Sequence, residues 1–156
     1  MEWIELGDVR TGLVAPEFSL LSGAGQTITR SQHRQRCNVV LYFVPAATAE
    51  ALAPLLDLLT TRRADFDEAN ACVYAITPRD APASQSPLLL ADPGGAVRAV
   101  YRNVFPKGQE PGEGETFAVV LDRYSGPWYV GRGDLDEAAI DGALTKLWAI
   151  EYDCPE

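Results

Sequence analysis

The chain has 156 residues, of which 47 % are hydrophobic and 22 % are charged, and its formal net charge is −9 at pH 7. This composition is typical of one globular domain, and no apolar stretch approaches the ~20 residues that a membrane-spanning helix requires. The negative charge argues against a nucleic-acid partner, because phosphate binding needs a basic face. The acidic amino terminus is unlike a secretory signal, so we expect a cytoplasmic protein.

The cysteine and histidine content limits the chemistry further. The chain has three cysteines, Cys37, Cys72 and Cys154, and none of them belongs to a C-x-x-C pair. An odd count without such pairs argues against a disulfide framework and against a zinc site. His33 is the only histidine, so a metal cluster or a catalytic triad would have no second imidazole. We therefore expect neither a metal nor a cofactor.

The first half of the chain is predicted to form a hairpin, two strands and a long helix. Glycines between residues 17–20 and 26–29 favour a tight turn and hence the hairpin. The continuously apolar run at 38–44 is typical of a central strand that is covered on both faces, and a second strand follows at 71–76. Between these two strands, leucines at helical spacing predict a helix from Thr48 to about Asp67.

The ends and the interior of this helix carry two further signals. Thr48 is a suitable N-cap, because its hydroxyl can accept a hydrogen bond from an otherwise unpaired backbone N–H group. Pro54 lies inside the helical stretch and is expected to introduce a kink, since proline has no N–H to donate.

The second half is predicted to contain shorter elements joined by irregular segments. Asp134 is the expected N-cap of a final helix that ends near Ile150. The other elements are a proline-rich loop at 78–87, a short strand at 88–91, a turn at 92–95, a short helix at 96–102, an irregular segment at 104–114, and a hairpin of strands at 116–121 and 128–130.

This order of elements predicts an α/β protein with a thioredoxin-like fold. A β-α-β half followed by a β-β-α half builds one mixed central sheet flanked by helices. We expect a single domain over residues 1–156, preceded by an N-terminal extension at 1–10 and followed by a C-terminal tail at 151–156.

Four stretches in chain order resemble a known family, the alkyl hydroperoxide reductase and thiol-specific antioxidant group of peroxiredoxins. GLVAPEFSL at 12–20 is similar to the opening motif of that family, and LYFVP at 41–45 is similar to the strand before its active site. LADPGG at 90–95 and TFAVVLD at 116–122 resemble its later turn and strand. The resemblance spans about residues 11–150 and implies a thiol peroxidase or oxidoreductase on a thioredoxin-like fold.

The residues that carry the family's chemistry are nevertheless missing. The family has a threonine and a nucleophilic cysteine as T-x-x-C at the start of the helix, where this chain has Thr48 and Ala51. The family arginine, three residues before the phenylalanine of the late strand, corresponds to Gly114. An alignment shifted by one residue would place Leu52, which also lacks sulfur, at the nucleophile position. Pro45, Thr48, Ala51 and Gly114 thus form a degenerate site.

The sequence therefore favours a protein that has lost peroxidase activity and serves as a binding or interaction module for an unknown protein or small molecule. The groove expected to bind it lies around Pro45, Thr48, Glu50 and Gly114. The resemblance also makes a homodimer plausible. The alternative is a thiol-dependent oxidoreductase that uses Cys154 or Cys37.

The remaining candidate residues have simpler interpretations. Cys37 and Cys72 are expected to be small, inert core residues, because free cysteine is among the most buried residue types. His33 is expected to be a solvated loop residue. Cys154 lies beyond the last predicted helix, where an exposed thiol could react. The three tryptophans, including Trp148, are expected to pack in or near the core.

Overall fold

The computed structural model describes residues 1–6 and 14–153, and within them eight strands form one sheet. The strand order across the sheet is β1-β8-β7-β4-β5-β6-β2-β3. The strands are β1 (Glu2–Glu5), β2 (Ser19–Ser22), β3 (Thr27–Thr29), β4 (Asn38–Phe43), β5 (Ala71–Thr77), β6 (Leu89–Ala91), β7 (Phe117–Leu121) and β8 (Pro127–Arg132). The helices are α1 (Ala49–Glu68), α2 (Ala96–Arg102) and α3 (Glu137–Asp153), and the 3₁₀ turns are η2 (Ser31–His33) and η3 (Pro93–Gly95).

The centre of the sheet is formed by three parallel strands, and antiparallel strands are added on both sides of them, β7 next to β4 and β2 next to β6. β4 pairs in parallel with β5 and antiparallel with β7, and β5 pairs in parallel with β6. Every residue of β4 is buried, which agrees with the apolar run that follows Asn38. A strand that is covered on both faces has no position where a polar side chain would reach water.

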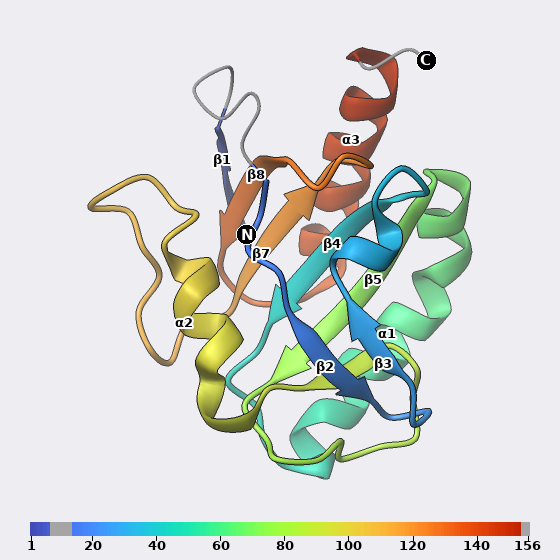
Figure 1. Cartoon of the computed structure of the whole chain (residues 1–156), viewed down its shortest axis with the longest axis vertical. Coiled ribbons are helices and arrows are strands. Elements are labelled where there is room, and N and C mark those ends of the chain that lie inside the picture. The colour runs from blue at the N-terminus through green and yellow to red at the C-terminus, as the bar shows by residue number, and fades with distance from the viewer. Residues whose placement is uncertain (7–13, 154–156) are drawn as a thin grey trace.

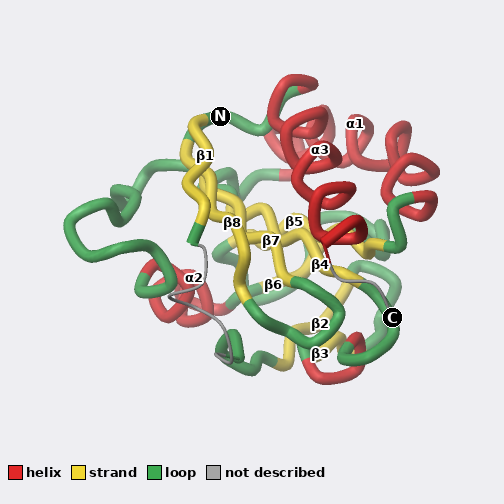
Figure 2. The backbone as a smooth tube through the Cα atoms, turned by 90° about the horizontal axis from the view of Figure 1, so that it is seen from above, coloured by secondary structure: helices red, strands yellow, loops and turns green. Residues whose placement is uncertain are grey.

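Helices cover both faces of the sheet and divide the core into two layers. Figure 2 shows α1 and α3 side by side on one face, whereas α2 lies on the other. Because side chains of a strand alternate between faces, Val40 and Tyr42 of β4 pack with α1 and α3, and Leu41 and Phe43 pack on the side of α2. This is the predicted α/β arrangement, with a mixed sheet between flanking helices.

Helix α1 follows the predicted helix closely. The Ala51 N–H donates a hydrogen bond of 3.2 Å to the Thr48 hydroxyl, so Thr48 is the N-cap as expected. Pro54 lies inside the helix, which continues past it to Glu68. The side of α1 that faces the sheet contributes four buried residues, Leu52, Leu56, Leu59 and Phe66.

Both ends of the described chain differ from the sequence prediction. Residues 2–5, expected to lie in an extension, form β1 and pair antiparallel with β8. Trp3 faces Gly131 in this pairing, and a Cβ atom on Gly131 would lie 2.9 Å from the Trp3 ring. Glycine therefore leaves room for the indole. At the other end, α3 continues to Asp153, so residues 151–153 belong to a helix and not to a tail.

The start of α3 and the position of its tryptophan also differ. The helix begins at Glu137, and the Asp136 carboxylate accepts a hydrogen bond of 2.8 Å from the Ala139 N–H. Asp136 therefore acts as the cap that we expected of Asp134, because the buried Leu135 must first be placed in the core. Trp148 is 49 % exposed, so the expectation that it packs in the core was wrong for much of its surface.

Within the described residues, no helix combines the length and the apolar character needed to cross a membrane.

Candidate functional site

The degenerate site lies where β4 ends and α1 begins. Pro45, Thr48 and Ala51 are all exposed there, whereas Leu52 is 0 % exposed and packs in the core beneath α1. Ala51 thus faces solvent in the first turn, as do Ala49 and Glu50, whereas the one-residue shift toward Leu52 places a core side chain in that position. Neither Cys37 nor Cys72 is near this helix terminus, because both lie at the opposite end of the strands.

The position expected to hold an arginine carries no side chain, but another arginine lies close by. Gly114 is exposed, and a Cβ atom built on it would contact nothing. Arg98 of α2 reaches toward this segment and donates hydrogen bonds to the carbonyl oxygens of Gly112 (3.1 Å), Glu113 (3.0 Å) and Glu115. Sequence reasoning missed Arg98, which lies in the short helix that follows the predicted turn at 92–95.

Arg98 is held in place by burial and by an aromatic ring as well as by these carbonyls. Its side chain is buried, with 9 % of the residue exposed, and its guanidinium carbon lies 4.9 Å from the centre of the Phe117 ring. Burial lowers the pKa of Arg98 from its usual value, because the charged form loses solvation. The terminal nitrogens of this guanidinium, Nη1 and Nη2, contact backbone carbonyl oxygens.

A pocket of about 360 Å³ opens beside this arginine. Pro45, Arg98, Arg102 and Glu113 line it, together with the glycines that begin α2 and with Pro78. The expected groove around Pro45, Thr48, Glu50 and Gly114 is therefore only partly realised. Pro45 lines the pocket, whereas the other three residues do not.

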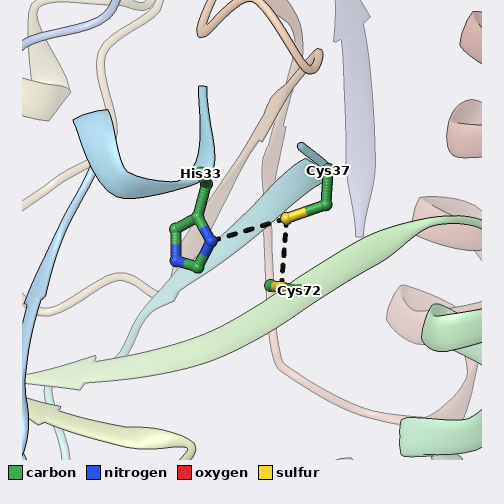
Figure 3. Close-up of side chains that lie close together, drawn as sticks. All are labelled: His33, Cys37 and Cys72. Carbon is green, nitrogen blue, oxygen red and sulfur yellow. Dashed lines mark hydrogen bonds between the residues drawn. The ribbon is translucent and has the colours of Figure 1, made fainter. Parts of the chain in front are cut away.

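The described cysteines meet at the other end of β4 and β5. The Sγ atoms of Cys37 and Cys72 are 3.1 Å apart, and the Cys37 Sγ is 3.4 Å from Nδ1 of His33. The second ring nitrogen of His33, Nε2, is 2.9 Å from the Tyr74 hydroxyl. Figure 3 shows the imidazole and both sulfurs directed toward one another. We call His33, Cys37, Cys72 and Tyr74 the thiol cluster.

The backbone explains why these residues meet. Cys72 and Tyr74 are two positions apart on β5, so their side chains point to the same face of the sheet. Val39 of β4 is directly opposite Cys72, and Cys37 lies two residues before Val39 and therefore on the same face. The turn at η2 is fixed by a hydrogen bond of 3.2 Å from the Cys37 N–H to the His33 carbonyl, which places the imidazole over the sulfurs.

The two thiols have different acidities. The hydrogen bond from Cys37, and a smaller contribution from His33, lower the pKa of Cys72 to about 5 even though burial opposes this shift. The pKa of Cys37 is raised, first by its hydrogen bond to Cys72 and then by burial. Burial also raises the pKa of Tyr74, so this hydroxyl keeps its proton at neutral pH. The contact between the two sulfurs therefore favours the charged form at Cys72 and disfavours it at Cys37.

The thiol cluster corrects three expectations. His33, expected to be solvated, is 8 % exposed and has polar partners on both ring nitrogens. Cys37 and Cys72, expected to be inert core residues, are partly exposed and in contact with each other. The available signals were the four-residue spacing of His33 and Cys37 and the alternate positions of Cys72 and Tyr74. Cys154, the other candidate thiol, lies outside the described residues.

Comparison with known proteins identifies the fold. No protein-family model matches the chain, and no curated protein matches it in sequence. Among solved structures, peroxiredoxin Q of Xanthomonas campestris aligns with a TM-score of 0.67 at 18 % identity, covering 94 % of this chain and 96 % of its own. Peroxidoxin BcpB of Mycobacterium tuberculosis aligns with a TM-score of 0.66 at 22 % identity, covering 91 % and 98 %. The fold is that of the peroxiredoxins.

A third structure supports the same conclusion. Thioredoxin peroxidase I of Plasmodium yoelii aligns with a TM-score of 0.67 at 15 % identity, over 91 % of this chain and 94 % of its own. At these identities the likeness concerns the path of the backbone, and not the side chains of a site. The peroxiredoxin fold is thus established for the chain, whereas its chemistry has to be argued from its own residues.

Proposed function

We propose that this peroxiredoxin-fold protein has lost peroxidase activity at the start of α1 and acts there as a binding module. The observation that carries the proposal is Ala51, which faces solvent in the first turn of α1 where the resemblance expects a nucleophilic cysteine. Thiol peroxidase chemistry needs a thiolate that forms a covalent intermediate. A methyl group can neither attack a peroxide oxygen nor carry the resulting sulfenic acid.

The neighbouring groups do not replace the lost function. The Thr48 hydroxyl accepts the Ala51 N–H and so serves as a helix cap. One nitrogen of the Arg98 guanidinium, Nη2, donates to backbone carbonyls of the 112–115 segment, so this part of the group is occupied by the protein itself. Without a nucleophile, the positive end of the α1 dipole has no reacting thiolate to stabilise.

The pocket beside Pro45 is the surface that we assign to binding. Its volume of about 360 Å³ lies within the range of small-molecule sites, and it combines apolar proline walls with two arginines and Glu113. A ligand or a peptide segment with both an apolar body and a polar end would match this lining. We propose that the partner is a protein or a small molecule, and not a nucleic acid, because the net charge of −9 disfavours phosphate backbones.

A peroxide-consumption assay tests the loss of activity. Hydrogen peroxide and an alkyl hydroperoxide are each followed in the presence of dithiothreitol, with the intact chain and with a variant in which all three cysteines are serine. We expect both proteins to consume peroxide at the same slow rate as the reductant alone. A rate at least tenfold higher for the intact chain would overturn the proposal.

A second candidate function is a thiol-dependent oxidoreductase that uses Cys37 or Cys154. The contact of 3.1 Å between the Cys37 and Cys72 sulfurs favours Cys37 in this role. In the same assay, turnover that is lost in Cys37→Ser but kept in Cys154→Ser would assign the activity to the thiol cluster. Turnover that is lost only in Cys154→Ser would assign it to the C-terminal cysteine.

The assembly and location of the protein are also proposals. We propose a cytoplasmic homodimer, on the basis of the resemblance to peroxiredoxins. Light scattering of the purified chain would give a mass near twice 16.9 kDa for a dimer. A mass of one chain across a tenfold concentration range would contradict this proposal.

A further inference from the structure

The distance between the two sulfurs of the thiol cluster is unusual for side chains that merely pack. Non-bonded heavy atoms have their best contact at about 3.5 to 4.0 Å, whereas Sγ of Cys37 and Sγ of Cys72 are 3.1 Å apart. A disulfide bond requires about 2.05 Å, so the two sulfurs have about one further ångström to close. The two sulfurs are therefore closer than packing requires and near to bonding.

A metal ion fits this geometry less well. Two cysteine sulfurs that bind one tetrahedral zinc ion, each at about 2.3 Å, lie about 3.8 Å apart, so the pair would have to open by several tenths of an ångström. Within the part of the chain that the structure describes, the group of possible ligands that includes these sulfurs contains only His33, Cys37 and Cys72. A structural zinc site would need a fourth protein ligand.

We propose that Cys37 and Cys72 form a reversible intramolecular disulfide, in which Cys72 reacts first with a low-molecular-weight disulfide and Cys37, assisted by His33, closes the bond. This inference concerns the opposite end of the sheet from the pocket beside Pro45. It goes beyond the proposed binding function and does not depend on it.

The surroundings of Cys72 make it the thiol that reacts first. Cys72 is partly exposed and lines a pocket of about 110 Å³ together with Arg63, Asp67 and Pro87. The pKa of Cys72 is lowered chiefly by the hydrogen bond from Cys37, and a thiolate is the nucleophile in thiol–disulfide exchange. Cys37 does not line this pocket.

His33 is placed to assist the second thiol. Its Nδ1 is 3.4 Å from the Cys37 sulfur, and its Nε2 is within hydrogen-bond distance of the Tyr74 hydroxyl. When the proton of the neutral ring is on Nε2 and is donated to Tyr74, the lone pair of Nδ1 faces the Cys37 thiol. In this tautomer His33 can accept the proton that Cys37 must lose before it attacks.

The reaction balances in two exchange steps. The Cys72 thiolate attacks one sulfur of a disulfide RSSR, which forms a mixed disulfide between Cys72 and RS and releases one RS⁻. Cys37 passes its proton to His33 and attacks the Cys72 sulfur, which forms the bond between Cys37 and Cys72 and releases a second RS⁻. His33 and the solvent return the protons to the thiolates. Overall, two protein thiols are oxidised and one RSSR is reduced to two RSH.

The decisive experiment measures this bond in glutathione buffers of defined ratio. The protein carries Cys154→Ser, so that only the two thiols of the cluster can react, and it is quenched with acid, alkylated and digested with trypsin. Cleavage after Arg36, Arg62, Arg63 and Arg79 yields the peptides 37–62 and 64–79. We expect these two peptides to be linked in oxidising buffer, with a mass two hydrogens below their sum, and to separate again when reduced glutathione is restored.

Single variants test the order of the steps. With Cys37→Ser we expect a stable glutathione adduct on Cys72, because the closing thiol is absent. With Cys72→Ser we expect an adduct on Cys37 that forms at least tenfold more slowly. His33→Asn keeps an acceptor near Cys37 but has no basic nitrogen, so we expect the mixed disulfide on Cys72 to persist at least tenfold longer than in the parent.

Three results would overturn the proposal. The first is an absence of linked peptides in fully oxidised glutathione, as expected for two inert packed thiols. The second is a pair of stable adducts, one on each cysteine, without closure of the bond. The third is stoichiometric zinc in the purified protein that blocks both thiols until a chelator is added, which would identify the cluster as a metal site. The peroxide assay is therefore also read on Cys72→Ser, in which the cluster has lost the thiol that reacts first, so failure here is distinguishable from failure of the proposed binding function.

Discussion

The two ends of the central parallel strands show opposite combinations of chemistry. At the carboxyl ends of β4 and β5 the chain has a helix N-terminus and a pocket with two arginines, but Ala51 in place of a sulfur. At the amino ends it has two sulfurs and an imidazole without a helix N-terminus. In Figure 1 these strands run from the upper to the lower part of the molecule. The six residues of β4 alone separate the two regions by about 17 Å.

The difference between these two ends indicates that a helix dipole is one of several ways to stabilise a thiolate. At the thiol cluster the stabilisation of Cys72 comes from a hydrogen bond donated by Cys37 and from His33. Hydrogen bonds of this kind act over a few ångströms and favour the charged form just as a helix terminus does. Reactive sulfur can therefore occur in this fold away from the end of the sheet where ligands usually bind.

The largest expected effect concerns the arginine at the pocket end. Arg98→Leu removes the donors to three backbone carbonyls and the contact with Phe117. We expect the free energy of unfolding to fall by about 3 kcal/mol, as is typical when buried polar groups lose their partners. Urea denaturation measures the change, and Arg34→Leu at an exposed position should stay within about 0.5 kcal/mol of the parent. Unchanged stability in Arg98→Leu would mean that this cation is free for a ligand.

The next effect distinguishes the thiol cluster from an ordinary thiol by its pH dependence. A pKa of about 5 means that Cys72 is protonated below pH 5 and is mainly thiolate from pH 6 upward. We expect its rate of alkylation by iodoacetamide to change less than twofold between pH 6 and pH 8, whereas an ordinary thiol of pKa 8.5 would react about 80-fold faster at the higher pH.

The matched control for this pH profile is a variant that lacks the hydrogen-bond donor to the Cys72 sulfur. Cys37→Ala eliminates the hydrogen bond that contributes most to the lowered pKa of Cys72, while His33 remains and Asp67 continues to oppose the thiolate. The pH profile should then become steeper and approach that of an ordinary thiol. A steep pH profile of alkylation in the parent protein would contradict a lowered pKa of Cys72, and with it the difference in chemistry between the two ends of β4 and β5.

A smaller effect is expected at the helix cap. Thr48→Ala removes the acceptor for the Ala51 N–H and should lower the free energy of unfolding by about 1 kcal/mol. Thr48→Ser keeps the hydroxyl and should recover most of this loss in the same urea titration. If Thr48→Ala leaves stability unchanged, the hydroxyl is free for another role at the degenerate site.

The smallest effect tests whether the contact of the second ring nitrogen of His33, Nε2, orients the imidazole. Tyr74→Phe removes the hydroxyl that lies 2.9 Å from Nε2 and leaves the ring of residue 74 in place. Loss of this orienting contact should prolong the mixed disulfide on Cys72 about threefold, equivalent to about 0.6 kcal/mol. Mass spectrometry of acid-quenched samples measures the lifetime. An unchanged lifetime would show that packing alone orients the imidazole.

Several elements were predictable from the sequence because their signals are local. The uninterrupted apolar run at 38–44 predicted a strand that is covered on both faces, and β4 is buried throughout. The leucines at helical spacing after Thr48 predicted α1, whose cap and extent agree with the prediction. In both segments the period of the side chains and the intrinsic backbone preferences favour the same structure.

The elements that could not be predicted depend on partners far away in the chain. β1 is a short strand with acidic ends, and its stability comes from pairing with β8, which lies more than one hundred residues later. The cap of α3 moved to Asp136 because the buried Leu135 fixes the chain before the helix starts. Tertiary packing overrides a local capping preference of about 1 kcal/mol.

The sequence alone determined the α/β class of this protein and the residue that stands at the start of its long helix, because both follow from residue identity and periodicity. Only the tertiary structure decided that His33, Cys37 and Cys72 meet. These residues come from a turn and two strands, and the distance between Cys37 and Cys72 along the chain says nothing about their contact of 3.1 Å in space. The register of β4 against β5 determines which side chains become neighbours, and that register is a property of the whole sheet.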